Sequence, residues 1–140
     1  MAEIHSIHSL DEFEKLKASH KYILIDFWAD WCPPCKAIAP FYANLAKKHG
    51  VPDSLAFAKV DIEEIPEISK TYGITSLPSF LVLQDGEPQG VDVGAQQLGG
   101  GAVVADGKVG LIRGADPKNL TLLATKLNEL AAPKEAAETS

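Results

Sequence analysis

The fold of this chain is decided by residues 22–36, which read YILIDFWADWCPPCK. Residues 22–28 form a nearly continuous apolar run, the pattern of a strand buried on both faces of a sheet. Asp26 interrupts this run, and a carboxylate in a core is unfavourable unless it is hydrogen-bonded or neutral. Directly after the run, Cys32 and Cys35 enclose two prolines. The stretch therefore predicts a buried strand that leads into a cysteine pair.

The two prolines, Pro33 and Pro34, indicate that the cysteine pair lies at the start of a helix. First-turn N–H groups have no partner inside a helix, so the missing N–H of proline is tolerated there. Cys32 then lies near the N-cap, and Cys35 follows one turn later on the same face. The helix macrodipole and the N–H of Cys35 favour a thiolate at Cys32. We therefore expect Cys32 to attack a disulfide and Cys35 to resolve the resulting mixed disulfide.

Two other interpretations of the cysteine pair stay open from spacing alone. A structural bridge is disfavoured, because a loop of two intervening residues is too short to stabilise the fold much. Half of a zinc site would need two more ligands, and the histidines at positions 5, 8, 20 and 49 show no paired ligand spacing. An inert buried pair is the other alternative. We favour redox chemistry and expect no metal site.

The remaining sequence predicts strands that alternate with helices. Ser9 and Glu12 form a capping box at the start of one helix, and Asp116 followed by Pro117 begins the last one. Strands are expected at residues 3–8, 22–28, 55–60, 79–83 and 108–113, with helices after Ser9, Cys32, Ile65 and Asp116. The order β-α-β-α-β-α-β-β-α predicts an α/β fold with a central mixed β-sheet flanked by helices on both faces.

We expect one domain over residues 1–131 and a flexible tail over residues 132–140, which lacks apolar anchors. About residues 87–107 form an insertion between the last two strands, where hairpin loops of about 2–5 residues are usual. Its glycines and few large apolar residues predict a mobile loop or a hairpin extension. The turn of such a hairpin would lie on the order of 17–25 Å from the cysteine pair, so we expect the insertion to stay remote from it.

The net charge of −6, from 19 acidic and 13 basic residues, is a poor match for nucleic acid or an anionic membrane. No apolar run reaches the length of a membrane span, and the N-terminus lacks the pattern of a secretory signal. We therefore expect a cytoplasmic monomer that binds neither nucleic acid nor membranes.

Residues 26–36, DFWADWCPPCK, followed by Ala39-Pro40-Phe41, resemble the active-site segment of the thioredoxin family. Four further segments match the family at the expected places: Lys59-Val60-Asp61, Tyr72-Gly73-Ile74, Leu77-Pro78-Ser79-Phe80 and Gly114-Ala115. The resemblance runs from about Ser9 to Ala131. It implies the thioredoxin fold and a protein disulfide reductase without a bound cofactor. It also implies two kinds of partner, an NADPH-dependent flavoprotein thioredoxin reductase and client proteins with reducible disulfides.

The sequence departs from the family at two places. Pro33 stands where most members have glycine, although the two-proline form resembles a variant among plant-type members. The missing N–H of Pro33 removes a weak positive partial charge, which predicts a modest shift of the reduction potential. The insertion at residues 87–107 is the second departure.

The resemblance also implies roles for residues around the dithiol. Asp26 would accept a proton from Cys35, with a pKa raised by burial, whereas the alternative is a core carboxyl with satisfied hydrogen bonds. Lys59 would be the partner charge of Asp26, and Trp28 would support the site from beneath. Pro78 would follow a cis peptide bond, so that the backbone of the preceding residue pairs with a client strand. The predicted docking surface consists of Trp31, Ile74, Leu77, Pro78, Gly114 and Ala115.

Other functions of the same fold compete with the reductase. Disulfide oxidases and isomerases have a more stable reduced form, and a binding module would have lost catalysis. The lack of a secretory signal and of a retention tail favours the reductase over the oxidase or isomerase. The presence of both cysteines, Asp26 and Pro78 disfavours the binding module.

Overall fold

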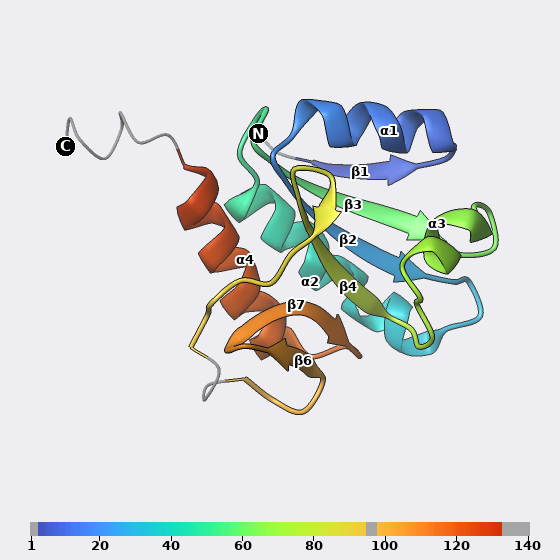
Figure 1. Ribbon diagram of the computed structural model, residues 1–140. Coiled ribbons are helices and arrows are strands. Elements are labelled where there is room, and N and C mark those ends of the chain that lie inside the picture. Colours follow the sequence, from blue (N-terminus) through green and yellow to red (C-terminus); the bar gives the residue numbers. More distant parts are fainter. Residues whose placement is uncertain (1–2, 95–97, 133–140) are drawn as a thin grey trace.

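The computed structural model describes residues 3–94 and 98–132. Its elements in chain order are β1 (Ile4–Ile7), α1 (Leu10–Ser19), β2 (Tyr22–Trp28), α2 (Pro33–His49), β3 (Leu55–Asp61), α3 (Pro66–Thr71), β4 (Ser79–Gln84), β5 (Glu87–Pro88), β6 (Ala102–Ala105), β7 (Lys108–Arg113) and α4 (Pro117–Ala131) (Figure 1). The predicted element order is confirmed, and the insertion adds the short strands β5 and β6. Residues 133–140 of the predicted tail lie outside the described residues.

The strands form one mixed sheet in the order β1-β3-β2-β4-β7-β6, and β5 pairs with the end of β4. β1 and β2 both run parallel to β3. β4 is antiparallel to β2, and β7 is antiparallel to β4, as predicted for the last two expected strands. The α/β class with a central mixed sheet is therefore confirmed.

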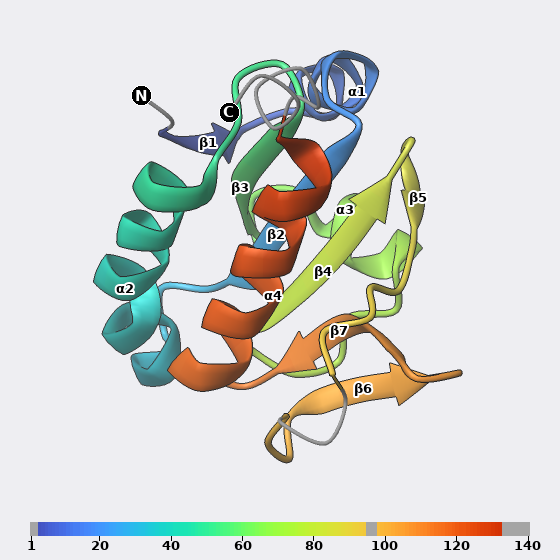
Figure 2. The same ribbon diagram turned by 90° about the vertical axis from the view of Figure 1, so that its left-hand side faces the viewer.

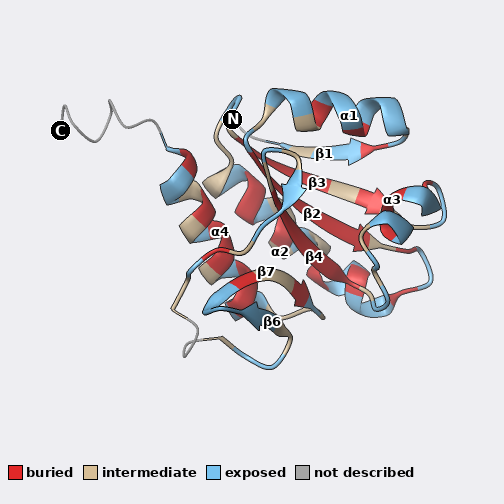
Figure 3. Ribbon diagram, in the orientation of Figure 1, coloured by how far each residue is buried: buried red, intermediate tan, exposed pale blue. Residues whose placement is uncertain are grey.

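Helices cover both faces of this sheet. α2 and α4 lie side by side on one face, and α1 and α3 lie on the other (Figures 1 and 2). The central strands between these layers are almost entirely buried (Figure 3). None of the described helices is long and apolar enough to cross a membrane.

The alternation of side chains along β2 decides the direction of Asp26. Tyr22 and Leu24 belong to the core cluster under α2 and α4, whereas Ile23, Ile25 and Phe27 belong to the cluster under α1 and α3. Successive side chains of a strand point to opposite faces. Asp26 therefore points toward the layer of α2, the helix that carries the cysteine pair.

The helices begin where the sequence predicts. The Ser9 hydroxyl accepts a hydrogen bond from the Glu12 N–H at 3.1 Å, and Asp116 caps α4. The capping box is not reciprocal, because the Glu12 carboxylate accepts from the N–H of His8 at 2.9 Å and not from that of Ser9.

The insertion does not extend the last two strands outward as one ribbon. After the turn at Asp85-Gly86, β5 pairs with β4 for two residues, and Val91 then bridges to Val109. Val91 is buried, and Val93 and Leu98 pack against the α2 and α4 core cluster. The insertion thus contributes apolar side chains to the core.

The distal hairpin geometry expected for the insertion is wrong, because its second half returns toward the end of the sheet that carries the cysteine pair. None of its described residues lines the groove that Cys32 borders. β6 pairs along the free edge of β7, with Ala102 opposite Ile112 and Ala105 opposite Lys108. Because Ser79 and Arg113 pair at the end of the sheet where β2 enters the cysteine loop, β6 starts at that same end. The physical reason is that β7 would otherwise be an unpaired edge, which the returning chain satisfies.

Candidate active site

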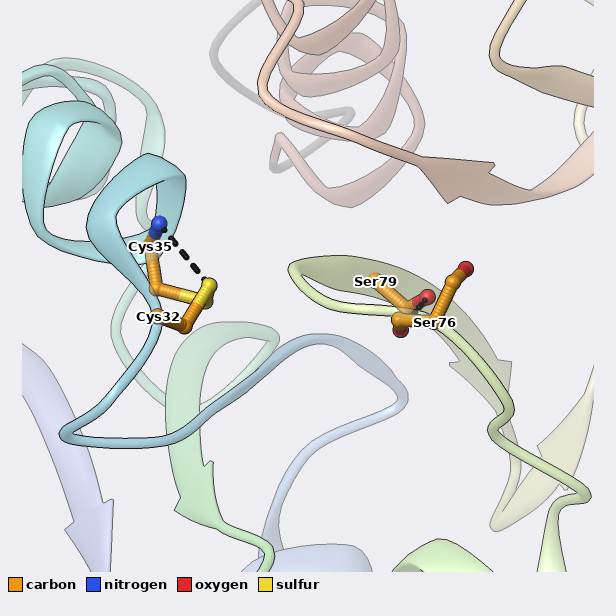
Figure 4. The surroundings of a disulfide bond; sticks show 4 residues. All are labelled: Cys32, Cys35, Ser76 and Ser79. Atoms are coloured by element: carbon orange, nitrogen blue, oxygen red, sulfur yellow. Dashed lines mark hydrogen bonds between the residues drawn. A yellow bond between two sulfur atoms is a disulfide. The ribbon is translucent and has the colours of Figure 1, made fainter.

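Cys32 and Cys35 form a disulfide at the start of α2 (Figure 4). Cys32 is the N-cap residue, and its sulfur accepts a hydrogen bond from the N–H of Cys35 at 3.2 Å. Pro33 and Pro34 occupy the first turn, as predicted. Because both prolines lack an N–H, the N–H of Cys35 is the first in α2, and it points toward the sulfur of Cys32, where it stabilises negative charge.

An open groove of about 440 Å³ begins at the disulfide. It is lined by Trp31, Cys32, Pro33, Pro34, Ile62, Ile74, Thr75, Ser76 and Leu77. Trp31 is 63% exposed, whereas Cys32 is only 4% exposed. Cys32 borders the groove and Cys35 does not, so a molecule in the groove meets the sulfur of Cys32 first. The sequence reasoning missed Ile62, Thr75 and Ser76, which reach the groove only through the folding of loops after β3 and α3.

The loop before β4 faces the disulfide (Figure 4). The Leu77–Pro78 peptide bond is cis, as the resemblance implied. The Ser79 hydroxyl donates to the carbonyl of Ser76 at 2.7 Å, and the N–H of Gly114 donates to the carbonyl of Pro78 at 2.8 Å. The first bond closes the turn before β4, and the second joins this turn to the residues after β7, so Pro78 and Gly114 lie together.

Asp26 is completely buried, and neither carboxyl oxygen accepts a hydrogen bond from any described residue. No described backbone or side-chain group therefore supplies the hydrogen bonds that a satisfied core carboxyl needs. Burial raises the pKa of Asp26 from 3.8 to about 7, and the positive charge of Lys59 partly opposes this shift. A carboxyl with this pKa exchanges protons at neutral pH.

Lys59 pairs with Asp26 in the register of β3 with β2. Its ammonium group lies over the ring of Trp28, 4.9 Å from the ring centroid. Within the described ranges, Lys59 forms no ion pair with Asp26 at 4.0 Å or less. Trp28 thus holds the cation by a cation–π contact, and Lys59 acts on Asp26 through its charge at a distance.

Tyr42 of α2 is a buried polar residue near Asp26 that the sequence analysis did not single out. Its hydroxyl is buried and lies 2.9 Å from the carbonyls of both Leu24 and Ala58, so it joins α2 to β2 and β3. Burial raises the pKa of Tyr42 well above its usual value, and the charge of Asp26 adds to this shift. A tyrosine at a core position of a helix was the available signal, because a buried hydroxyl needs a partner.

Among residues 3–94 and 98–132, no three histidine, cysteine, aspartate or glutamate side chains are grouped so that they could hold a metal ion. The predicted residues Trp31, Ile74 and Leu77 line the groove, and Pro78, Gly114 and Ala115 form the adjoining loops. The fold and this disulfide together define a thiol–disulfide oxidoreductase.

Comparison with known proteins gives the family. The family model described as thioredoxin matches residues 5–100. A thioredoxin-like protein of Fusarium culmorum is 44% identical over 133 residues, which cover 95% of this chain and 98% of the relative. A thioredoxin of Neurospora crassa is 37% identical over 131 residues, which cover 94% of this chain and 91% of the relative. The solved structure of a Malassezia sympodialis thioredoxin is similar with a TM-score of 0.68, at 28% identity, over 91% of this chain and 93% of that one.

The chain belongs to the thioredoxin family. It is a thiol–disulfide oxidoreductase with a redox-active disulfide between Cys32 and Cys35. Its function is the reduction of disulfides by the Cys32–Cys35 dithiol. The oxidase or isomerase alternative is not favoured.

Proposed function

We propose that Cys32 attacks client disulfides and that Cys35 resolves the mixed disulfide. The thiolate of Cys32 attacks one client sulfur, forms a bond to it and releases the other client sulfur as a thiolate. Cys35 then loses its proton and attacks Cys32, which releases the first client sulfur and closes the Cys32–Cys35 disulfide. Two electrons pass to the client. The observation that carries this assignment is that Cys32 borders the groove and accepts the N–H of Cys35.

Asp26 takes the proton of Cys35 in the second step. Support comes from its direction toward α2, its complete burial and a pKa of about 7, which lets the carboxylate act as a base near neutral pH. Lys59 keeps a fraction of Asp26 ionised, and Trp28 keeps Lys59 in place.

Clients bind as extended segments along the groove. The backbone of Leu77, before the cis bond to Pro78, pairs with the client strand, and apolar contacts come from Trp31, Ile74, Gly114 and Ala115. Electrons return to the disulfide from an NADPH-dependent flavoprotein thioredoxin reductase. The protein acts in the cytoplasm as a monomer, without a bound cofactor.

Trapping of the mixed disulfide tests this assignment. A Cys35→Ser variant should accumulate mixed disulfides with an insulin client, because the resolving thiol is gone. The matched Cys32→Ser variant should accumulate none, because the attacking thiol is gone. Non-reducing mass analysis reads the covalent adducts. Adducts on Cys32→Ser and none on Cys35→Ser would reverse the two roles.

A further inference from the structure

Three consecutive glycines of the insertion, Gly99, Gly100 and Gly101, lie where β7 ends and α4 begins. We call this segment the glycine latch. The N–H of Gly99 donates to the side-chain carbonyl of Asn119 at 2.7 Å, and Asn119 is completely buried. The carbonyl of Gly101 accepts the N–H of Arg113 at 2.8 Å. The latch is thus bonded both to α4 and to the last residue of β7.

Gly114, Ala115 and Asp116 connect the end of β7 at Arg113 to the start of α4 at Pro117. The N–H of Gly114 is held by the carbonyl of Pro78 at 2.8 Å. The Asp116 carboxylate caps α4 by accepting from the N–H groups of Lys118 at 2.9 Å and Asn119 at 3.2 Å. The Gly114–Ala115 loop is therefore held on one side by Pro78, directly before β4, and on the other side by the glycine latch.

A side chain would meet a close neighbour at two of the three latch positions, a backbone atom at Gly101 and a movable carboxylate at Gly99. A β-carbon at Gly101 would overlap with the carbonyl oxygen of Arg113. A β-carbon at Gly99 would lie 2.8 Å from a carboxylate oxygen of Asp116. At Gly100 a β-carbon would meet no described heavy atom within 4 Å. None of the three glycines has a positive φ, so these differences come from packing and not from backbone conformation.

We propose that the glycine latch positions the Gly114–Ala115 loop for client docking. The proposal rests on the proposed function, in which this loop contacts the client. If the latch moves away from Arg113, the hydrogen bond from the Arg113 N–H to the Gly101 carbonyl breaks, and the Gly114–Ala115 loop becomes less ordered. Binding of a client must then order this loop, and the free energy this costs lowers the affinity for the client. The chemistry of the dithiol does not change, because Cys32 and Cys35 are held by α2 and not by the latch.

The test compares Gly101→Ala with its neighbour Gly100→Ala in the full chain. In Gly101→Ala we expect KM for insulin to rise about threefold to tenfold with little change in kcat, the range given by one lost hydrogen bond. Reduction of 5,5′-dithiobis(2-nitrobenzoic acid), a small disulfide that does not need the docking surface, should keep its wild-type rate. Gly100→Ala should match the wild-type protein in both assays.

Further variants keep the test decisive. Gly99→Ala meets the movable carboxylate of Asp116, so it perturbs the latch with less risk to folding and should raise KM for insulin in the same direction. Ala115→Glu alters the loop itself and should raise KM whether or not the latch acts. The role of the latch would be contradicted if Gly101→Ala or Gly99→Ala folds and keeps the wild-type KM while Ala115→Glu raises KM. The docking surface would stand in that case. A wild-type KM in Ala115→Glu would instead overturn the docking surface of the proposed function.

Discussion

Lys59 lies opposite Asp26 in the parallel pairing of β2 with β3, yet its ammonium group sits over the ring of Trp28 and forms no ion pair with that carboxylate. The arrangement leaves Asp26 as a buried acid whose pKa is near 7, because burial outweighs the attraction of the more distant cation.

Replacement of Asp26 by alanine should stabilise the protein most at high pH. The pKa of Asp26 is raised on folding from 3.8 to about 7, so between these values the folded state binds more protons than the unfolded state. The contribution of Asp26 to the free energy of unfolding therefore falls as pH rises through this window and is level above it, with a loss on the order of 4 kcal/mol. Asp26→Ala lacks this loss.

Urea denaturation of both proteins at pH 4, 5.5, 7 and 8 measures the difference. We expect the advantage of Asp26→Ala to grow from pH 4 to pH 7 and then to stay constant. An advantage that does not change with pH would contradict the raised pKa of Asp26. In a separate assay without urea, Asp26→Ala should reduce client disulfides more slowly at pH 7 than the wild-type protein does, because Cys35 has lost its base.

Replacement of Lys59 by methionine should raise the pKa of Asp26 further, because the cation that favours the carboxylate is removed. The limb of the pH–rate profile that depends on Asp26 should therefore move to higher pH, and the rate at pH 7 should fall. A matched control is Lys21→Met at the other end of β2, where the ammonium lies over the Tyr22 ring at 5.8 Å. Equal shifts of the profile in both variants would rule out a specific action of Lys59.

Replacement of Tyr42 by phenylalanine should destabilise the fold by about 1–2 kcal/mol. The change removes a buried hydroxyl that lies 2.9 Å from the carbonyls of Leu24 and Ala58 but keeps the ring that packs against Phe57 and Phe80. The midpoint of urea denaturation at pH 5 gives the free energy of unfolding. A midpoint equal to that of the wild-type protein would show that these two contacts contribute no net stability.

Replacement of Val91 by alanine should show that the insertion is part of the core. Val91 is 4% exposed and packs in the cluster under α2 and α4, so its truncation should cost about 1–3 kcal/mol. Val104→Ala in β6 is the matched control, because Val104 is 43% exposed, and it should change stability by less than about 0.5 kcal/mol. Effects in thermal denaturation that are equally small for both substitutions would contradict the core role of Val91.

The sequence by itself determined the fold class and the dithiol. The apolar run of β2, the prolines after Cys32 and the caps at Ser9 and Asp116 are local signals, and the structure places each element where they predict it. Such signals act over a few residues, through strand burial, first-turn N–H groups and capping side chains. They therefore remain readable without knowledge of distant contacts.

Tertiary structure alone decided the surroundings of Asp26 and the path of the insertion. Whether a buried carboxyl finds a partner depends on how β3 and α2 pack around it. Local sequence does not show that the Lys59 ammonium lies over the Trp28 ring instead of pairing with Asp26. Likewise, the glycines at 99–101 resemble a loop in sequence. Gly99 and Gly101 nevertheless pack closely, because Arg113, Asp116 and Asn119 fold beside them. Contacts between segments far apart in the chain determine both features, so only the assembled fold reveals them.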